Sequence, residues 1–144
     1  MSVERSGTAL PPVDDVAGER RSKQRFVARR RGEPCFWLVL DGQRIALNDL
    51  SAEGFSYPSL TPRANAEVFD FVLQREGLPD EIRGRAETVS YLADAAQTGC
   101  HFLGIEGDGA QRLRDWLIAH VIVSASVRIT EKDAAAIVAG PSLV

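Results

Sequence analysis

The chain has 144 residues, of which 44% are apolar and 26% are charged, and its net charge at neutral pH is −3. These values are ordinary for a soluble globular protein and allow one domain with a buried core. No stretch approaches the ~20 consecutive apolar residues of a membrane-spanning helix, and the first residues lack the apolar segment of a signal peptide. We therefore expect a cytoplasmic protein without membrane insertion.

The first thirty residues divide into a tail and a basic segment. Residues 1–18 contain Pro11-Pro12 and Asp14-Asp15, show no hydrophobic period, and are predicted to be a disordered tail. Residues 20–31 then hold seven of the 17 Lys and Arg residues, whereas the rest of the chain is acidic. Proteins that bind nucleic acid usually carry a basic face over the whole domain. This concentrated patch favours a small anionic ligand, and it makes nucleic acid an unlikely partner.

The middle of the chain is predicted to form short antiparallel strands. Asp41-Gly42 lies between two apolar runs and is typical of a β-hairpin turn. The last two strands are expected to pair across the loop 93–99. Regular spacing of short strands with turn residues between them predicts a mainly β fold, a barrel or a sandwich. The predicted strands are 26–31, 35–40, 43–48, 54–58, 66–73, 83–92 and 100–105.

Two helices are predicted after the strands. Apolar residues recur at helical spacing over 109–123, so this helix should pack across a barrel mouth with Trp116 in the core. Thr130 and Asp133 form a capping pattern before a second helix at 131–139, and Gly140-Pro141 ends it. The extension 124–144 is expected either to cover a sheet edge or to contact a partner.

Catalytic and metal-binding patterns are missing from the sequence. Cys35 and Cys100 have no CxxC neighbour and are predicted to be buried structural thiols, while His101 and His120 are isolated. There is no P-loop, nucleophile elbow or HExxH motif, and the glycine-rich segment 104–109 is interpreted as a strand-to-helix turn. We expect no enzymatic activity, no cofactor and no metal site.

Two short motifs flank the predicted hairpin. Arg21-x-x-x-Arg25 precedes it, and Asp49-x-Ser51-x-x-Gly54 follows it. Each motif alone is common, but both in this order resemble the two-part signature of PilZ domains, receptors for the second messenger cyclic di-GMP. The resemblance covers residues 19–123. It implies a PilZ-like antiparallel β-barrel with a C-terminal helix packed on it, followed by the extension 124–144.

The resemblance also implies which residues bind cyclic di-GMP. Arg21 and Arg25, with Arg20 as a third contact, would reach phosphates and guanine through a planar fork that suits both groups. Asp49 would accept hydrogen bonds from the N1–H and N2–H₂ groups of guanine. Ser51 would supply a hydroxyl, and Gly54 would leave room for the base. The alternative for the second motif is a turn whose Asp and Ser side chains bind their own backbone.

The predicted function is therefore that of a non-enzymatic receptor, a monomer or homodimer, that regulates an unidentified protein effector. Ordering of residues 19–25 on binding would create or remove the effector's surface. The resemblance implies control of motility, biofilm formation or polysaccharide export. Two alternatives remain: a PilZ-type interaction module without ligand, and a small β-barrel protein that binds nucleic acid. Tyr91 could stack on a base, but core packing is its preferred interpretation.

Overall fold

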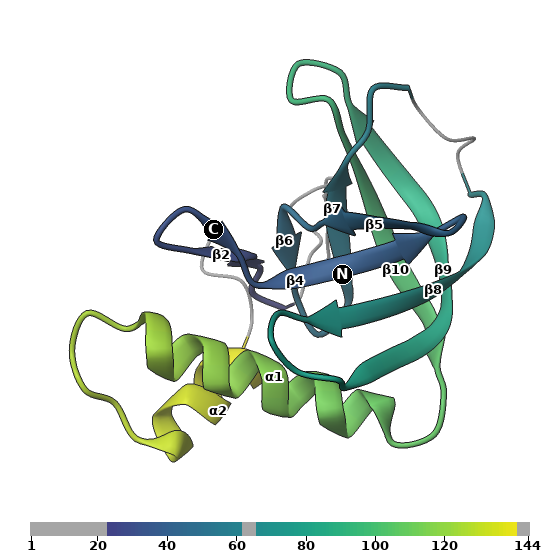
Figure 1. Ribbon diagram of the computed structural model, residues 1–144. Helices are drawn as coiled ribbons and strands as arrows, with labels where there is room; N and C mark the ends of the chain where they lie inside the picture. Colours follow the sequence, from purple (N-terminus) through teal and green to yellow (C-terminus); the bar gives the residue numbers. More distant parts are fainter. Residues whose placement is uncertain (1–22, 62–65, 141–144) are drawn as a thin grey trace, which may run out of the picture.

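The computed structural model describes residues 23–61 and 66–140 (Figure 1). Eight strands form one antiparallel sheet in the order β1-β6-β7-β10-β9-β8-β4-β5, which curls into an open barrel, and the two strands β2 and β3 form a separate ribbon. This architecture, with helices packed on it, confirms the predicted mainly β, barrel-like fold. The strands are β1 Phe26–Val27, β2 Arg29–Arg30, β3 Glu33–Pro34, β4 Phe36–Leu40, β5 Gln43–Ala46, β6 Asp49–Leu50, β7 Gly54–Pro58, β8 Val68–Arg75, β9 Glu81–Leu92 and β10 Gln97–Ile105.

The core lies on the concave side of the curled sheet. In β4, Phe36, Leu38 and Leu40 are buried at every second position, as expected because successive side chains of a strand point to opposite faces. Phe55 and Phe71 meet edge to face in this core, with ring centroids 5.8 Å apart. Cys100 is buried beside them in the same cluster, and Cys35 is buried too, as predicted for structural thiols.

Two of the predicted strands are interrupted. The predicted strand 26–31 breaks at the fully buried Ala28, because the backbone N–H of Ala28 turns to the carbonyl of Asn48. The predicted strand 43–48 ends at Ala46, and Asp49 begins β6 instead of a loop. The break occurs because Leu47 donates its N–H to Phe36, whereas Asn48 donates to Ser56 on the other side of the barrel. This crossing places Asp49 between β1 and β7.

Two helices, α1 (Gly109–Ser124) and α2 (Glu131–Ala139), lie together below the barrel in Figure 1. Trp116 of α1 is buried against Phe36, with ring centroids 5.9 Å apart, which confirms its predicted place in the core. The backbone N–H of Asp133 donates to Thr130 Oγ1 over 3.1 Å, as the capping pattern predicts. In the part of the chain that the structure describes, neither helix has the length and apolarity to cross a bilayer.

The C-terminal extension packs on α1 through α2. Its buried side chains, Ala134 and Val138, belong to the common core, and α1 is the main contact of α2. The extension thus adds a second helix to the helical layer. Ile129 and Ile137 of the extension also line a cavity together with Phe26 and Val27 of the edge strand β1.

Candidate functional site

The two halves of the sequence motif meet in space. Arg25 Nη1 donates to Asp49 Oδ1 over 3.0 Å, and the side chains are 25% and 22% exposed. The pairing of Val27 with Asp49 in the β1–β6 ladder brings the basic segment alongside this carboxylate. Arg20, Arg21 and the predicted tail 1–18 lie outside the described residues. The observed motif is therefore an ion pair between the second arginine and the aspartate.

This ion pair leaves hydrogen-bonding capacity unused. Within residues 23–61 and 66–140, the buried Nε of Arg25 has no hydrogen-bond partner. The ion pair occupies Asp49 Oδ1, so Oδ2 remains available to accept from another group. A guanidinium has five N–H donors and a carboxylate accepts at both oxygens. Arg25 and Asp49 can therefore contact each other and still offer a donor and an acceptor to a ligand.

Ser51 holds its own loop together. Its side chain is buried, and its Oγ accepts from the backbone N–H groups of Glu53 over 3.1 Å and of Gly54 over 3.2 Å. The Ser51 N–H donates to the Gly54 carbonyl over 2.9 Å. This is the local turn that the sequence left open as an alternative, and it occupies the hydroxyl assigned to the ligand. The turn fixes the loop that follows Asp49.

Gly54 serves strand packing. A Cβ at this position would overlap the carbonyl oxygen of Cys100 in the neighbouring strand β10. The space that the sequence interpretation reserved for a base is thus filled by the protein's own backbone. The glycine allows β7 and β10 to approach closely.

Substitution of Gly54 by alanine should therefore reduce stability. We expect a loss of about 1–3 kcal/mol, as for other overpacked sites, because the obstacle is backbone and cannot rotate away. Gly104→Ala is the matched control in the same sheet, since a Cβ there meets nothing within 4 Å. Urea denaturation of both variants measures the difference. Equal stabilities of the two variants would show that β7 and β10 tolerate the extra atom.

Lys23 connects the motif loop to the second helix. Its backbone N–H donates to Glu53 Oε1 over 3.3 Å, and its Nζ donates to the Ala139 carbonyl over 2.9 Å. Ala139 is the last residue of α2, where carbonyl groups lack helical partners and a cation is favourable. The basic segment therefore touches both the candidate site and the C-terminal extension. No sequence pattern signals this contact, because 116 positions separate its residues.

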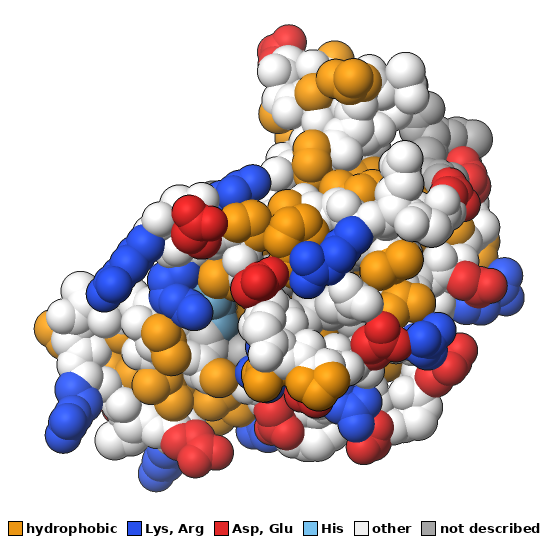
Figure 2. Space-filling model, in the orientation of Figure 1, with side chains coloured by type: hydrophobic (Ala, Val, Ile, Leu, Met, Phe, Trp, Pro, Cys, Tyr) orange, Lys and Arg blue, Asp and Glu red, His pale blue; other side chains and the backbone are white. Residues whose placement is uncertain are grey.

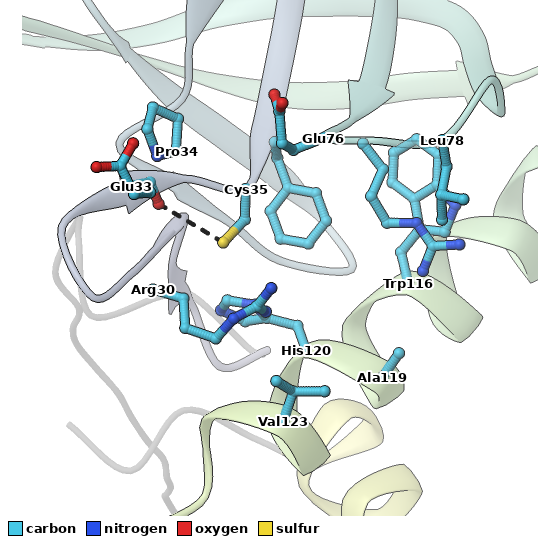
Figure 3. A pocket seen from close by; sticks show the side chains of 12 residues that line it. Arg30, Glu33, Pro34, Cys35, Glu76, Leu78, Trp116, Ala119, His120 and Val123 are labelled. Carbon is cyan, nitrogen blue, oxygen red and sulfur yellow. Dashed lines mark hydrogen bonds between the residues drawn. The ribbon is translucent and has the colours of Figure 1, made fainter.

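A cavity of about 300 Å³ opens between the β2–β3 ribbon, the end of β8 and α1 (Figure 3). His120 reaches it from α1, and its Nε2 donates to the Val27 carbonyl over 2.9 Å. Because a carbonyl only accepts, Nε2 carries the proton, and the neutral ring presents Nδ1 as an acceptor. Burial lowers the pKa of His120 and raises the pKa of the Cys35 thiol in the cavity wall. Both side chains are thereby kept neutral.

The lowered pKa of His120 predicts a stability change with pH. The unfolded chain has a histidine pKa near 6.5 and binds a proton that the folded chain resists, so stability falls as pH drops below about 6.5. The slope should approach about 1.4 kcal/mol per pH unit at most. His120→Gln keeps an N–H donor without titrating, and it should flatten the dependence between pH 7 and 5. An unchanged slope in that variant would assign the effect to another group.

Two other sequence interpretations concern Tyr91 and metals. The sequence favoured a place in the core for Tyr91. The structure instead shows a half-buried side chain whose hydroxyl donates to the Leu60 carbonyl over 3.1 Å. Its place near the end of the β9–β10 hairpin explains this, because the hairpin extends beyond the core. Among the described residues, no three His, Cys, Asp or Glu side chains gather as metal ligands.

The comparisons with known proteins bear on the fold. No protein-family model matches the chain, and no curated protein has a matching sequence. The inhibitor of motility MotI/DgrA of Bacillus subtilis is similar in structure, with a TM-score of 0.51 and 12% identity over 76% of this chain. This chain spans 54% of that protein. An uncharacterised Legionella protein aligns with a TM-score of 0.44 and 16% identity, over 67% of this chain and 89% of that one. The likeness to the Bacillus protein shows that this fold also occurs in an inhibitor of motility.

Proposed function

We propose that this protein is a non-enzymatic, PilZ-like receptor for cyclic di-GMP that regulates a protein effector in the cytoplasm. The observation that carries the proposal is the Arg25–Asp49 ion pair, which joins the two halves of a receptor-like motif across 24 positions of sequence. The fold likeness to an inhibitor of motility supports motility as the regulated process. Biofilm formation and polysaccharide export are further processes that the resemblance implies.

The ion pair is suited to guanine. Guanine presents an acceptor, O6, next to a donor, N1–H. Arg25 and Asp49 present a donor and an acceptor side by side, which is the complementary arrangement. The free Nε of Arg25 is buried in the absence of ligand, so the segment that carries it has to move for full contact. Arg20 and Arg21 would then bind the phosphates.

Movement of residues 20–25 of the basic segment would pass the binding signal on to the effector. Lys23 is two residues from Arg25 and holds the end of α2 through the Ala139 carbonyl. Binding that draws residues 20–25 toward the ligand would release this contact and change the surface formed by α1 and α2. The extension 124–144 thus becomes the element that reports ligand binding.

Calorimetric titration tests the proposal. Cyclic di-GMP should bind with a saturable heat, whereas a generic single-stranded oligonucleotide of equal phosphate concentration should not. Preferential oligonucleotide binding that weakens steeply with salt would favour the nucleic-acid alternative.

A second candidate is an interaction module without ligand. The engagement of Ser51 in its own turn and the packing of Gly54 against Cys100 favour it, because both residues then have structural roles. The absence of heat with either ligand, combined with capture of an effector by the α1–α2 surface, would support this candidate.

Amide hydrogen exchange should detect the coupled ordering. From their low apolar content, we predict fast amide exchange for residues 1–22 in the free protein. Lys23 already donates its N–H to Glu53 without ligand, so the coupled ordering concerns residues 20–22. Cyclic di-GMP should slow exchange at residues 20–22 while residues 1–15 stay fast, and protection of residues 20–22 without ligand would contradict coupled ordering.

A further inference from the structure

The cavity beside α1 has polar groups that the fold leaves unsatisfied. Trp116 is 1% exposed and His120 is 6% exposed, and both line the cavity. Among the described residues, neither Trp116 Nε1 nor His120 Nδ1 has a hydrogen-bond partner. Buried polar groups are nearly always paired in folded proteins. Two such groups in the wall of one cavity point to a polar partner, which reaches them after movement of the wall because both atoms are closed to solvent in the free protein.

Two arginines add positive charge to the same cavity. Arg30 lines it from the β2–β3 ribbon, and Figure 3 shows its side chain extending beside the His120 ring. In the described ranges Arg30 forms no ion pair, although Glu33 lies opposite it in the ribbon register. Arg75 pairs with Asp80 through Nη2, but its buried Nε has no partner within those ranges. The cavity thus offers donors from two cations.

Two acidic residues, Glu33 and Glu76, also line the cavity, and the Glu33 carboxylate points away from Arg30 in Figure 3. Glu76 is engaged elsewhere. The Glu76 carboxylate accepts from Trp37 Nε1 over 2.7 Å and pairs with Arg44 at 3.5 Å. Trp37 and Arg44 do not line the cavity. The rest of the wall is largely apolar, with Phe36, Leu78 and Val123 among its residues. Small-molecule sites combine such apolar walls with a few polar groups.

We propose that this cavity binds a small organic anion: a carboxylate on an apolar body that also carries a hydroxyl. The carboxylate pairs with Arg30, and it accepts from Arg75 Nε and Trp116 Nε1 once the wall side chains move, because both atoms are closed to solvent in the free protein. The hydroxyl donates to His120 Nδ1. Arg25 and Asp49 do not line this cavity, so the site is separate from the proposed cyclic di-GMP site and does not depend on it.

A matched series of probes tests the assignment on the full chain. 3-Phenyllactate carries all three features, 3-phenylpropanoate lacks the hydroxyl, and 3-phenyllactamide lacks the charge. The indole N–H signals of Trp37 and Trp116 are followed by NMR, with Trp37→Phe to assign them. We expect 3-phenyllactate to shift the Trp116 signal saturably and the amide to bind about tenfold more weakly or worse, because charge-assisted hydrogen bonds are lost.

Two arginine variants separate specific contact from general charge. Arg30→Gln should weaken 3-phenyllactate binding about tenfold. Arg31→Gln removes an equal charge from the next residue, which does not line the cavity, and should change affinity by no more than about twofold. No Trp116 shift with any probe at millimolar concentrations would mean that water satisfies these groups and would overturn the proposal. Binding that is indifferent to Arg30→Gln or to loss of the carboxylate would overturn the anion assignment.

Discussion

Replacement of Arg25 by alanine is expected to weaken cyclic di-GMP binding by about 2–4 kcal/mol, because charge-assisted bidentate contacts to the ligand are lost. The substitution also leaves Asp49 without the cation that it contacts over 3.0 Å, so the proposed acceptor for the base loses its partner. Calorimetric titration of the variant measures the loss. Arg21→Ala, outside the described residues, should have an effect of the same size.

The matched control for Arg25→Ala is the removal of three neighbouring positive charges that are not assigned to the ligand. Arg29, Arg30 and Arg31 are exposed on the β2–β3 ribbon, and together they carry more charge than Arg25. Their joint replacement should weaken cyclic di-GMP binding far less, since exposed charges act through a screened field. Equal losses from both changes would indicate diffuse electrostatic attraction and would favour a nucleic-acid partner.

Cyclic di-AMP should bind at least ~100-fold more weakly than cyclic di-GMP, because a site built for hydrogen bonds rejects an analogue that lacks them. Adenine has no N1–H for Asp49, and it places an amino donor where guanine has O6, opposite an arginine donor. Unpaired polar groups cost about 1–3 kcal/mol each in a closed site, and two bases compound the loss. Parallel titrations with the two dinucleotides measure the ratio.

Asp49→Asn is the variant that tests the origin of this selectivity. It keeps the shape of the side chain but loses its charge, and its amide can turn a donor toward the base. Binding of cyclic di-GMP should fall, and the gap between the two ligands should narrow. Wild-type affinity in this variant would mean that Asp49 only supports β6 and its ion pair with Arg25.

The parts of the fold that follow local patterns were predictable. The strand 54–58 agrees with β7, and the helix 131–139 agrees with α2 down to the Thr130 cap. The pattern of apolar residues that defines α1 also placed Trp116 in the core correctly. These features depend on residues within a few positions of one another, so the sequence determines them directly.

The features that combine distant segments were not predictable. The strand 43–48 breaks because Leu47 and Asn48 bond to opposite sides of the barrel. Nothing near Lys23 in sequence indicates its bond to Ala139. Within the candidate site, the resemblance of the two motifs to PilZ domains singled out Arg25 and Asp49, which the structure joins in an ion pair. The Ser51 hydroxyl that the resemblance assigned to the ligand instead accepts from the backbone of its own turn, and the sequence left these two roles open as alternatives.

The NMR signal of the Arg25 side chain gives the most direct test of guanine recognition by Arg25 and Asp49. Its Nε–H is buried and without a partner among the described residues, so its NMR signal should respond strongly to a new acceptor. Arg25→Lys assigns the signal in labelled protein. We predict that cyclic di-GMP shifts the Arg25 Nε–H resonance saturably, whereas cyclic di-AMP at the same concentration leaves it in place. A resonance that stays unmoved while cyclic di-GMP binds would contradict guanine recognition by Arg25 and Asp49.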